Sequence, residues 1–226
     1  MKTALITGAN RGIGYELAKQ LLNKDWRVIV TARDSHKGHE AVSKLDNKNA
    51  IFHTLDVASE TSIKVVGSFI ATKYKTLDLL VNNAGIIATN DDTTSVSMDD
   101  VRSVMDCNFF GPVQLSKTVL PALKNSEDGR IINISSGMGA MGEAGRGYAA
   151  YRFSKTALNG LTNHMASDLS GTVKVVSVCP GWVKTDMGGS NASRNVTDAV
   201  KEIVALAEMP NLRSGKFYRD RKIIDW

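Results

Sequence analysis

The sequence has little cysteine, little proline, few aromatic residues and no long apolar run. Its 226 residues include two cysteines, four prolines and 6% aromatic residues. Cys107 and Cys179 lie far apart and form no CxxC pair, which excludes a disulfide scaffold and predicts thiols buried in a reducing compartment. No stretch reaches the ~20 apolar residues of a membrane span, and the apolar residues at the start are too few for a secretory signal. We therefore expect a soluble, cytoplasmic protein with no membrane partner.

The chain also lacks a strong excess of one charge. Its 28 basic and 23 acidic residues give a net charge of +5. Nucleic-acid binding would gather Lys and Arg on one face, whereas here they are scattered, and the densest run, 219–222, contains its own acid. We expect a solvated surface and a small anionic ligand, with no nucleic-acid partner. His36 and His39 lie one helical turn apart without further ligands at matching spacing, so no metal is expected.

Short apolar runs alternate with longer amphipathic stretches along the chain. Hydrophobic residues at 42% and charged residues at 23% are ordinary for a globular domain. The runs typical of buried strands are 3–7, 27–32, 50–55, 77–82, 130–135 and 174–179, with a further short strand near 215–218. The stretches typical of helices are 14–23, 36–45, 59–74, 98–124, 148–170 and 195–208, with a kink at Pro112.

This alternation, with its short connections, predicts an α/β fold. The expected architecture is a doubly wound parallel sheet, the Rossmann fold, of about seven strands flanked by helices. No linker, repeat or low-complexity tract divides the chain, so residues 1–226 are expected to form a single domain.

A glycine-rich run follows the first predicted strand and opens directly into a helix. In TGANRGIG, residues 7–14, Gly8 permits a tight turn, Gly12 lets a phosphate approach the backbone, and Gly14 allows close helix–strand packing. The helix N-terminus adds free N–H groups and a positive dipole end. A merely tight turn needs neither the second nor the third glycine, so the run predicts a dinucleotide site. Its expected contacts are Gly8, Asn10, Arg11, Gly12, Ile13 and Gly14.

The end of the second predicted strand indicates which dinucleotide is bound. Enzymes that choose NAD place an acid there to bind the ribose 2′-OH. Here Ala32 takes that position, and Arg33 follows with a guanidinium group that suits a 2′-phosphate. Arg11 adds a second cation on the same side, so these residues favour NADP(H). The alternative takes Asp34 as the ribose acid, shifted by two positions, which would favour NAD(H).

Five short motifs stand in order along the chain. They are the glycine loop, residues 82–85 (NNAG), 135–136 (SS), 151–155 (YRFSK) and 180–187 (PGWVKTDM). With them the sequence resembles the short-chain dehydrogenase/reductase family over essentially its whole length. The runs 179–187 and 219–226 (RDRKIIDW) are most similar to the carbonyl reductase branch. The resemblance implies a Rossmann-type catalytic domain that binds NADP(H) and reduces a small carbonyl compound.

The chemistry of that family explains one pair of residues. Tyr151 and Lys155 are four residues apart and therefore share one face of a helix. A phenol with a pKa of about 10 is a poor acid–base catalyst near neutral pH. A neighbouring ammonium group and an oxidised nicotinamide favour the phenolate, and a pKa lower by about 3 units corresponds to roughly 4 kcal/mol. We therefore expect Tyr151 to donate the proton in carbonyl reduction.

The resemblance implies further site residues. Lys155 also holds the nicotinamide ribose, Ser136 hydrogen-bonds the carbonyl oxygen as charge builds on it, and Asn108 anchors a water in the proton relay to Lys155. Besides Tyr151 and Lys155, the implied cofactor contacts are Asp56 and Val57 at the adenine ring, Asn83, Ala84 and Gly85 at the adenine ribose, Pro180, Gly181 and Val183 along the bend beside the nicotinamide, and Thr185 at its carboxamide.

Two of these assignments have rivals nearby. Tyr148 is less suitable than Tyr151, because the residue four positions later is Arg152 rather than lysine. Ser135 competes with Ser136, and family register favours the second serine. The separation from Ser136 to Tyr151 is slightly longer than the family's usual spacing, and the loop 137–147 is expected to absorb the difference.

The substrate is expected over the nicotinamide, between the loop 137–147 and the segment 182–195. Met138, Met141, Trp182 and Met187 give these walls an apolar, adaptable character that suits a hydrophobic or aromatic body. The alternative is that these four side chains pack in the core. Residues 188–190 (GGS) are typical of the hinge of a mobile lid.

These patterns predict an NADPH-dependent reductase of aldehydes or ketones. The alternative is an NADP(H)-binding regulatory or signalling protein with little turnover, which would not require Ser136, Tyr151 and Lys155 together. A sugar-nucleotide epimerase is disfavoured, because no substrate domain follows the sheet. Relative to the monomeric carbonyl reductases that it resembles, the chain lacks a long insertion ahead of Tyr151 that covers the helices through which relatives usually dimerise. A homodimer or homotetramer is therefore expected.

Overall fold

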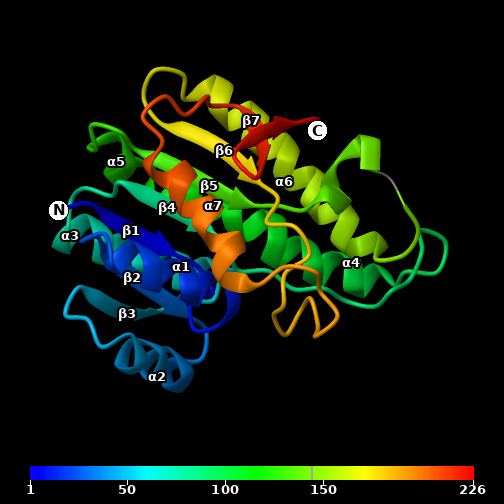
Figure 1. The fold of residues 1–226 in the computed structure, drawn as a ribbon, viewed down its shortest axis with the longest axis horizontal. Coiled ribbons are helices and arrows are strands. Elements are labelled where there is room, and N and C mark those ends of the chain that lie inside the picture. The colour runs from blue at the N-terminus through cyan, green and yellow to red at the C-terminus, as the bar shows by residue number, and fades with distance from the viewer. Residues whose placement is uncertain (144) are drawn as a thin grey trace.

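The computed structural model describes residues 1–143 and 145–226 as one sheet with helices on both faces (Figure 1). The strands are β1 (Thr3–Ile6), β2 (Arg27–Ala32), β3 (Ala50–Thr54), β4 (Leu79–Asn82), β5 (Arg130–Ile134), β6 (Lys174–Val178), β7 (Lys216–Arg219) and β8 (Lys222–Ile224). The α-helices are α1 (Gly12–Leu22), α2 (Ser35–Leu45), α3 (Glu60–Lys73), α4 (Met98–Met105), α5 (Gly111–Lys124), α6 (Ala149–Asp168) and α7 (Val196–Glu208). Among the described residues, no helix is both long and apolar enough to cross a membrane.

The strand order confirms a doubly wound α/β fold. The sheet runs β3-β2-β1-β4-β5-β6-β7-β8. Neighbours from β3 to β7 are parallel, and only β8 pairs antiparallel, with β7. The chain winds outward from β1 to β3, then returns to lay β4 on the other side of β1. This reversal opens a crevice at the carboxyl ends of β1 and β4.

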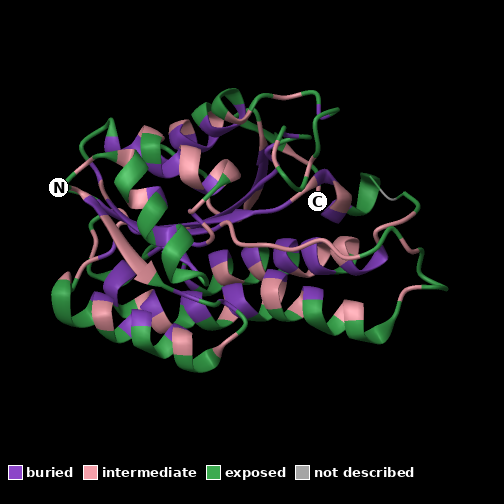
Figure 2. Ribbon diagram, turned by 90° about the horizontal axis from the view of Figure 1, so that it is seen from below, coloured by how far each residue is buried: buried purple, intermediate pink, exposed green. Residues whose placement is uncertain are grey.

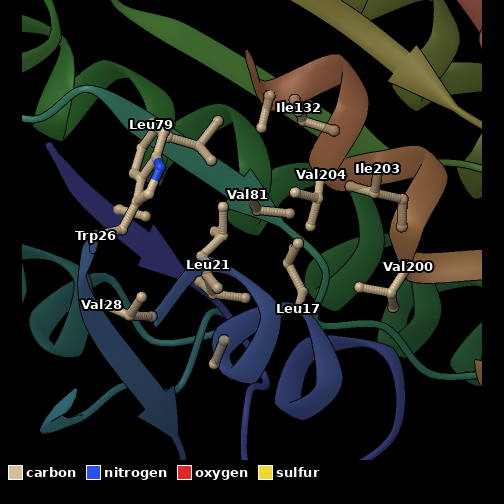
Figure 3. Packing of buried hydrophobic residues seen from close by; sticks show 14 of the residues in the cluster. Leu17, Leu21, Trp26, Val28, Leu79, Val81, Ile132, Val200, Ile203 and Val204 are labelled. Carbon is tan, nitrogen blue, oxygen red and sulfur yellow. The ribbon is translucent and has the colours of Figure 1, made fainter. Parts of the chain in front are cut away.

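Two apolar layers hold the helices to the sheet. Figure 3 shows side chains of α1 and α7 converging on one face of the central strands, with Leu17, Leu21, Val200, Ile203 and Val204 over Val81 and Ile132. Helices α3 and α5 cover the other face with Ile63, Val66, Ile70, Leu115 and Val119. Figure 2 shows the result, with the sheet and inner helix faces buried and the outer faces exposed. Each fully buried Leu, Ile or Val contributes roughly 1.5–3 kcal/mol.

A buried polar chain crosses three strands near their carboxyl ends. The Asn82 Nδ2 atom donates to Asn133 Oδ1 at 2.8 Å and to Ser116 Oγ at 3.2 Å. Asn133 Nδ2 donates in turn to Thr162 Oγ1 on α6, which lies 2.8 Å from Ser177 Oγ. Since each buried polar group has a partner, the chain fixes the register of β4, β5, β6 and α6 directly beneath the candidate site.

The structure departs from the predicted elements in two places. The expected helix over 98–124 is interrupted by a π-helical turn, Asp106–Phe110, in which Gly111 N–H donates to the Asp106 carbonyl five residues back. Pro112 is the second residue of α5 and has no N–H to donate to the preceding helical turn, so the regular hydrogen-bond ladder is interrupted there. Strand β8 was not predicted, because its hairpin turn consists of Asp220 and Arg221 at φ values of 51° and 60°. Such turns usually carry Asn or Gly.

Candidate active site

The loops after β1, β4, β5 and β6 meet at the carboxyl edge of the sheet. Helix α6 packs against β6 and against the short 3₁₀ turn Gly137–Gly139 that follows β5. Figure 1 shows α6 running beside these strands, so its first turns lie close to the strand ends. Ligands of open α/β sheets bind at this edge, beside the reversal of strand order.

The glycine loop is held in place by hydrogen bonds to the NNAG motif, residues 82–85. Gly8 and Gly12 have φ values of +61° and +57°, which only glycine adopts without strain. Thr7 Oγ1 accepts from the main-chain N–H groups of Asn83 and Ala84, both at 2.9 Å. Asn83 Nδ2 donates to the carbonyls of Thr7 at 2.8 Å and Gly8 at 3.1 Å. The NNAG motif therefore buttresses the glycine loop.

Gly14 is required by the same packing. A Cβ at this position would lie 2.5 Å from Asn83 Nδ2 and 2.6 Å from the Gly8 carbonyl oxygen. A larger residue would therefore push α1 away from the loop. This is the close helix–strand approach that the sequence predicts for the third glycine.

The N-terminus of α1 fits an anion. Helices α2, α3 and α4 each begin with a side-chain cap, from Asp34, Ser59 and Ser97. The residue before α1 is Arg11, which makes no side-chain cap, and the first turn contains no acid. The first N–H groups of a helix lack helical partners, and those of α1 receive no side-chain capping oxygen from Arg11. A pyrophosphate satisfies such groups.

The residues at the end of β2 favour Arg33 over Asp34 as the group that selects the dinucleotide. Asp34 Oδ1 accepts from the Lys37 N–H at 3.1 Å and so caps α2. Arg33 is exposed, and no ion-pair partner for it occurs within residues 1–143 and 145–226. Arg11 is instead ion-paired with Asp186, which joins the glycine loop to the segment after β6.

Tyr151 and Lys155 lie side by side at the start of α6. The Lys155 Nζ atom is 5.5 Å from the centroid of the Tyr151 ring. It donates to the Ile134 carbonyl at the end of β5, at 2.8 Å, and the residue is only 4% exposed. A buried ammonium group whose hydrogen-bond acceptor is a neutral carbonyl is costly, because a carbonyl does not neutralise the charge.

Burial dominates the protonation of this pair. It raises the pKa of Tyr151 to about 12, and a hydrogen bond from Ser136 offsets that only in part. Burial also lowers the pKa of Lys155 to about 8. Desolvation disfavours the charged form of each group. The lower Tyr151 pKa expected from Lys155 together with the oxidised nicotinamide therefore stays a prediction for the cofactor-bound enzyme.

The two serines after β5 have different surroundings. Ser135 is 2% exposed, and its hydroxyl donates to the Lys155 carbonyl at 3.5 Å, so it supports α6. Ser136 is half-buried and accepts from the Met138 N–H at 3.1 Å, and its hydroxyl acts to lower the pKa of Tyr151. This arrangement favours Ser136 as the serine that faces a substrate carbonyl.

The Asn108 side chain is fully bonded within the protein. Its Oδ1 atom accepts from the Ile86 N–H at 2.8 Å, while Nδ2 donates to the Ile86 carbonyl at 2.9 Å and to Ser154 Oγ at 3.0 Å. The Ser154 hydroxyl donates to the Tyr151 carbonyl at 2.7 Å. Asn108 therefore connects the turn after β4 to the first turns of α6.

The remaining predicted contacts lie around the same edge. Asp56 is exposed and accepts from the Ala58 N–H at 3.0 Å, and Val57 is buried beneath it. Gly85 faces the interior, since a Cβ there would lie 3.3 Å from Asn108 Oδ1. Thr185 lies against the glycine loop, because a Cβ on Gly12 would be 3.4 Å from its Cγ2 atom. Pro180, Gly181 and Val183 form the bend that leads from β6 to Thr185.

Three of the four predicted pocket residues are exposed rather than packed in the core. Met141, Trp182 and Met187 are 73%, 57% and 46% exposed, and Met138 is half-buried. Residue 144 of the loop 137–147 lies outside the described residues. In the expected lid, Trp182 Nε1 donates to the Gly188 carbonyl at 2.8 Å. The glycine run therefore forms part of a bonded turn in this conformation.

Two supporting residues escaped prediction from the sequence. Thr7 was noted only as part of the loop, although its hydroxyl carries two of the hydrogen bonds that shape it. Arg194 was not singled out, yet its Nη1 atom donates to the Pro180 carbonyl at 3.1 Å. Thr7 could have been found, because a polar residue at the end of a buried strand is a usable signal. The contact of Arg194 joins separate segments and has no local signal in the sequence.

The chain is similar to known proteins in both sequence and structure. A family model described as short chain dehydrogenase matches residues 2–195. Carbonyl reductase [NADPH] 1 of Mus musculus is 31% identical over 99% of this chain and 98% of the relative. The carbonyl reductase Sniffer of D. melanogaster superposes with a TM-score of 0.92 at 32% identity, covering 100% of both chains. An NADPH-bound carbonyl reductase from chicken fatty liver gives 0.92 at 32% identity, covering 100% of this chain and 94% of the other.

Proposed function

The chain belongs to the short-chain dehydrogenase family, and from this premise we propose that it reduces the carbonyl group of an apolar or aromatic aldehyde or ketone. It is an NADP-dependent oxidoreductase, in line with the NADPH-dependent carbonyl reductases that it resembles. The observation that carries the proposed reaction is the placement of Ser136, Tyr151 and Lys155 at one edge of the sheet, opposite a glycine loop shaped for a pyrophosphate.

Ser136, Tyr151 and Lys155 each have a defined part in the proposed reaction. Ser136 donates a hydrogen bond to the substrate oxygen, where negative charge builds as the carbonyl carbon is reduced. Tyr151 transfers its hydroxyl proton to that oxygen, which completes the alcohol, and Lys155 keeps a cation beside the resulting phenolate. When bound, the dinucleotide supplies the hydride, and its oxidised ring adds the positive charge that the protein's own groups do not provide.

Asn108 is best proposed as a positioning residue. Its side-chain oxygen and nitrogen are taken by Ile86 and Ser154. A water that passes protons toward Lys155 would therefore bind the main chain of Asn108, which lies within the π-helical turn. The proton relay that the family resemblance implies is therefore proposed to run through a water on the Asn108 main chain.

The cofactor contacts follow from the same edge of the sheet. We propose that Arg33 binds the 2′-phosphate, since it is exposed while Asp34 is committed to capping α2. Arg11 binds the same 2′-phosphate once its ion pair with Asp186 opens. The glycine loop and α1 hold the pyrophosphate, with Asn83 acting through the loop. Thr185 and the Pro180–Val183 bend line the nicotinamide, and Asp56 and Val57 the adenine.

The proposed substrate class is inferred from the side chains that line the candidate substrate pocket. Exposed Met141, Trp182 and Met187, with half-buried Met138, offer flexible thioethers and an indole ring. Such side chains suit a hydrophobic or aromatic body and adapt to several shapes. The competing function, an NADP(H)-binding regulator with little turnover, has no use for the buried Lys155, whose desolvation destabilises the fold.

We further propose a homo-oligomer in the cytoplasm. The alignment with the mouse carbonyl reductase spans 274 positions against 226 residues in this chain, so the relative carries segments absent here. Phe110 and Phe153 are 47% and 42% exposed on neighbouring helical segments that such residues would cover. The free thiols of Cys107 and Cys179 suit a reducing compartment.

Replacing the proposed proton donor tests the reaction. We expect Tyr151→Phe to lower kcat by about 10²- to 10⁴-fold, the usual contribution of general acid catalysis, with little change in NADPH affinity. The measurement is NADPH oxidation over a panel of aldehydes and ketones, with Tyr148→Phe as the matched control. Unchanged turnover in Tyr151→Phe would reject the mechanism. A wild-type protein that binds NADPH tightly without turnover would support the regulator instead.

Replacing the proposed phosphate ligand tests the cofactor contact. We expect Arg33→Ala to raise the Kd for NADPH by about tenfold, because a charge-assisted hydrogen bond is lost, and to leave the Kd for NADH within about twofold. Titration of cofactor fluorescence measures both constants. Lys44→Ala, which removes the same charge from the far end of α2, is the control. An equal loss of affinity for both dinucleotides would contradict a role at the 2′-phosphate.

The assembly is tested by light scattering at micromolar concentration. We expect a mass of at least twice the 24.4 kDa of the chain, because exposed aromatic faces of this kind gain from mutual burial. Phe153→Asp should shift the mass toward the monomer. A single species of 24 kDa for the wild type would contradict the proposal.

A further inference from the structure

The β7–β8 hairpin reaches both walls of the candidate pocket. Arg219 ends β7, and Asp220 and Arg221 form the turn to β8. Adjacent residues have Cα atoms about 3.8 Å apart. Figure 1 shows this last part of the chain beside β6 and α6. The motif RDRKIIDW, which the proposed chemistry does not use, is this hairpin and the residues that follow it.

Arg219 holds the loop after β5. Its Nη2 atom donates to Glu143 Oε2 at 3.0 Å and lies 2.9 Å from Oε1, so both carboxylate oxygens are engaged. The guanidinium passes beside the residue that follows Ser136, because a Cβ on Gly137 would lie 2.5 Å from Nη2. Arg219 therefore fixes the segment that runs from the catalytic serine to Glu143.

The end of the described chain supports the same loop. The Met141 N–H donates to the Trp226 main-chain oxygen at 3.0 Å. The Trp226 ring stacks on Phe217 of β7 at 5.7 Å between centroids, and Phe217 is fully buried against Ala140 and Cys179. The loop that carries Met141 is thus tied to the hairpin by a main-chain bond as well as by an ion pair.

Asp220 holds the opposite wall through Arg194. Arg194 Nη1 lies 2.6 Å from Asp220 Oδ1 and donates to the Pro180 carbonyl at 3.1 Å. Its main chain pairs with the same wall, since Arg194 N–H donates to the Trp182 carbonyl at 3.0 Å and its own carbonyl accepts from Lys184 N–H at 2.8 Å. The Arg194 side chain is 23% exposed, so the contact is partly shielded from water.

We propose that Arg219 and Asp220 form a double clasp that sets the spacing between the two walls of the substrate pocket. Arg219 binds Glu143 in the loop after β5, and Asp220 binds Arg194, which contacts the bend after β6. Because one peptide bond joins Arg219 to Asp220, the positions of both walls are fixed relative to the same turn of the hairpin. The clasp is a positioning and specificity element, and its effect on substrate binding rests on the proposed carbonyl reduction.

The same turn supplies a matched control. Arg221, next to Asp220, makes an ion pair with Glu202 of α7 at 2.6 Å, and this pair touches neither wall. Glu143→Gln, Asp220→Asn and Glu202→Gln each remove one carboxylate charge from an ion pair of the hairpin. Asn tolerates the positive φ of residue 220 better than other replacements do, so Asp220→Asn preserves the turn.

Amide hydrogen exchange of the free protein tests the clasp without reference to activity. Glu143→Gln should accelerate exchange in residues 137–143 by about fivefold, the order expected for one partly screened ion pair. Asp220→Asn should do so in residues 180–194, and Glu202→Gln in neither. Unchanged exchange in both walls, or equal acceleration in all three variants, would overturn the clasp.

Kinetics then separates positioning from general stability. Glu143→Gln should raise the KM for the ketone by about fivefold while the Kd for NADPH stays within twofold. Asp220→Asn should raise both, since the bend after β6 lines the proposed nicotinamide site, and Glu202→Gln should raise neither. Parallel changes in the control would overturn the specificity role. If the wild type lacks NADPH-dependent turnover, the proposed function fails, and the exchange pattern alone decides whether the clasp exists.

Discussion

The candidate site depends on an amine buried at the edge of a parallel sheet. Lys155 is almost inaccessible, and the hydrogen bond of its Nζ atom goes to a main-chain carbonyl rather than to a carboxylate. Burial lowers its pKa to about 8, so at neutral pH the fold carries a charge that it stabilises poorly. A core built for stability alone would place an apolar residue here. The proposed carbonyl reduction would account for this position, because it needs a cation beside the Tyr151 hydroxyl in surroundings dry enough for the charge to act strongly.

The rest of the architecture holds that group in register with a dinucleotide site. Buried Asn82, Asn133 and Thr162 fix β4 and β5 to α6, and Asn108 fixes the turn after β4 to the same helix. The glycine loop is shaped by Thr7 and Asn83, from the ends of β1 and β4, so the strand reversal itself defines the crevice. Helices α1, α6 and α7 begin without a side-chain cap, whereas α2, α3 and α4 have one. The uncapped N–H groups of α1, next to the glycine loop, suit an anionic ligand.

Local signals in the sequence were sufficient for most of the fold and for the shared helix face of Tyr151 and Lys155. Strands and helices were predictable because their apolar periods are set over short distances, and the spacing of Tyr151 and Lys155 fixes their shared helix face. What escaped prediction depends on contacts between distant segments. The hairpin turn at Asp220 and Arg221 lacks its usual residues, the pairing of Arg11 with Asp186 spans the chain, and Asn83 serves the glycine loop. The opposing effect of burial on the Tyr151 pKa was not predicted, because residue spacing does not reveal burial.

The pH dependence of stability in Lys155→Met tests the buried amine most directly. A basic group whose pKa is lower in the folded state destabilises the fold fully below that pKa, and the penalty shrinks as the pH rises from the folded pKa toward the unfolded one. Between pH 7 and pH 9.5, wild-type Lys155 becomes neutral in the folded state but stays protonated in the unfolded chain. Urea unfolding should therefore show the wild type gaining about 2 kcal/mol relative to Lys155→Met over this interval, for a folded pKa of about 8. Parallel stability curves for the two proteins would show that Lys155 is not held as a destabilised cation, and would contradict the account.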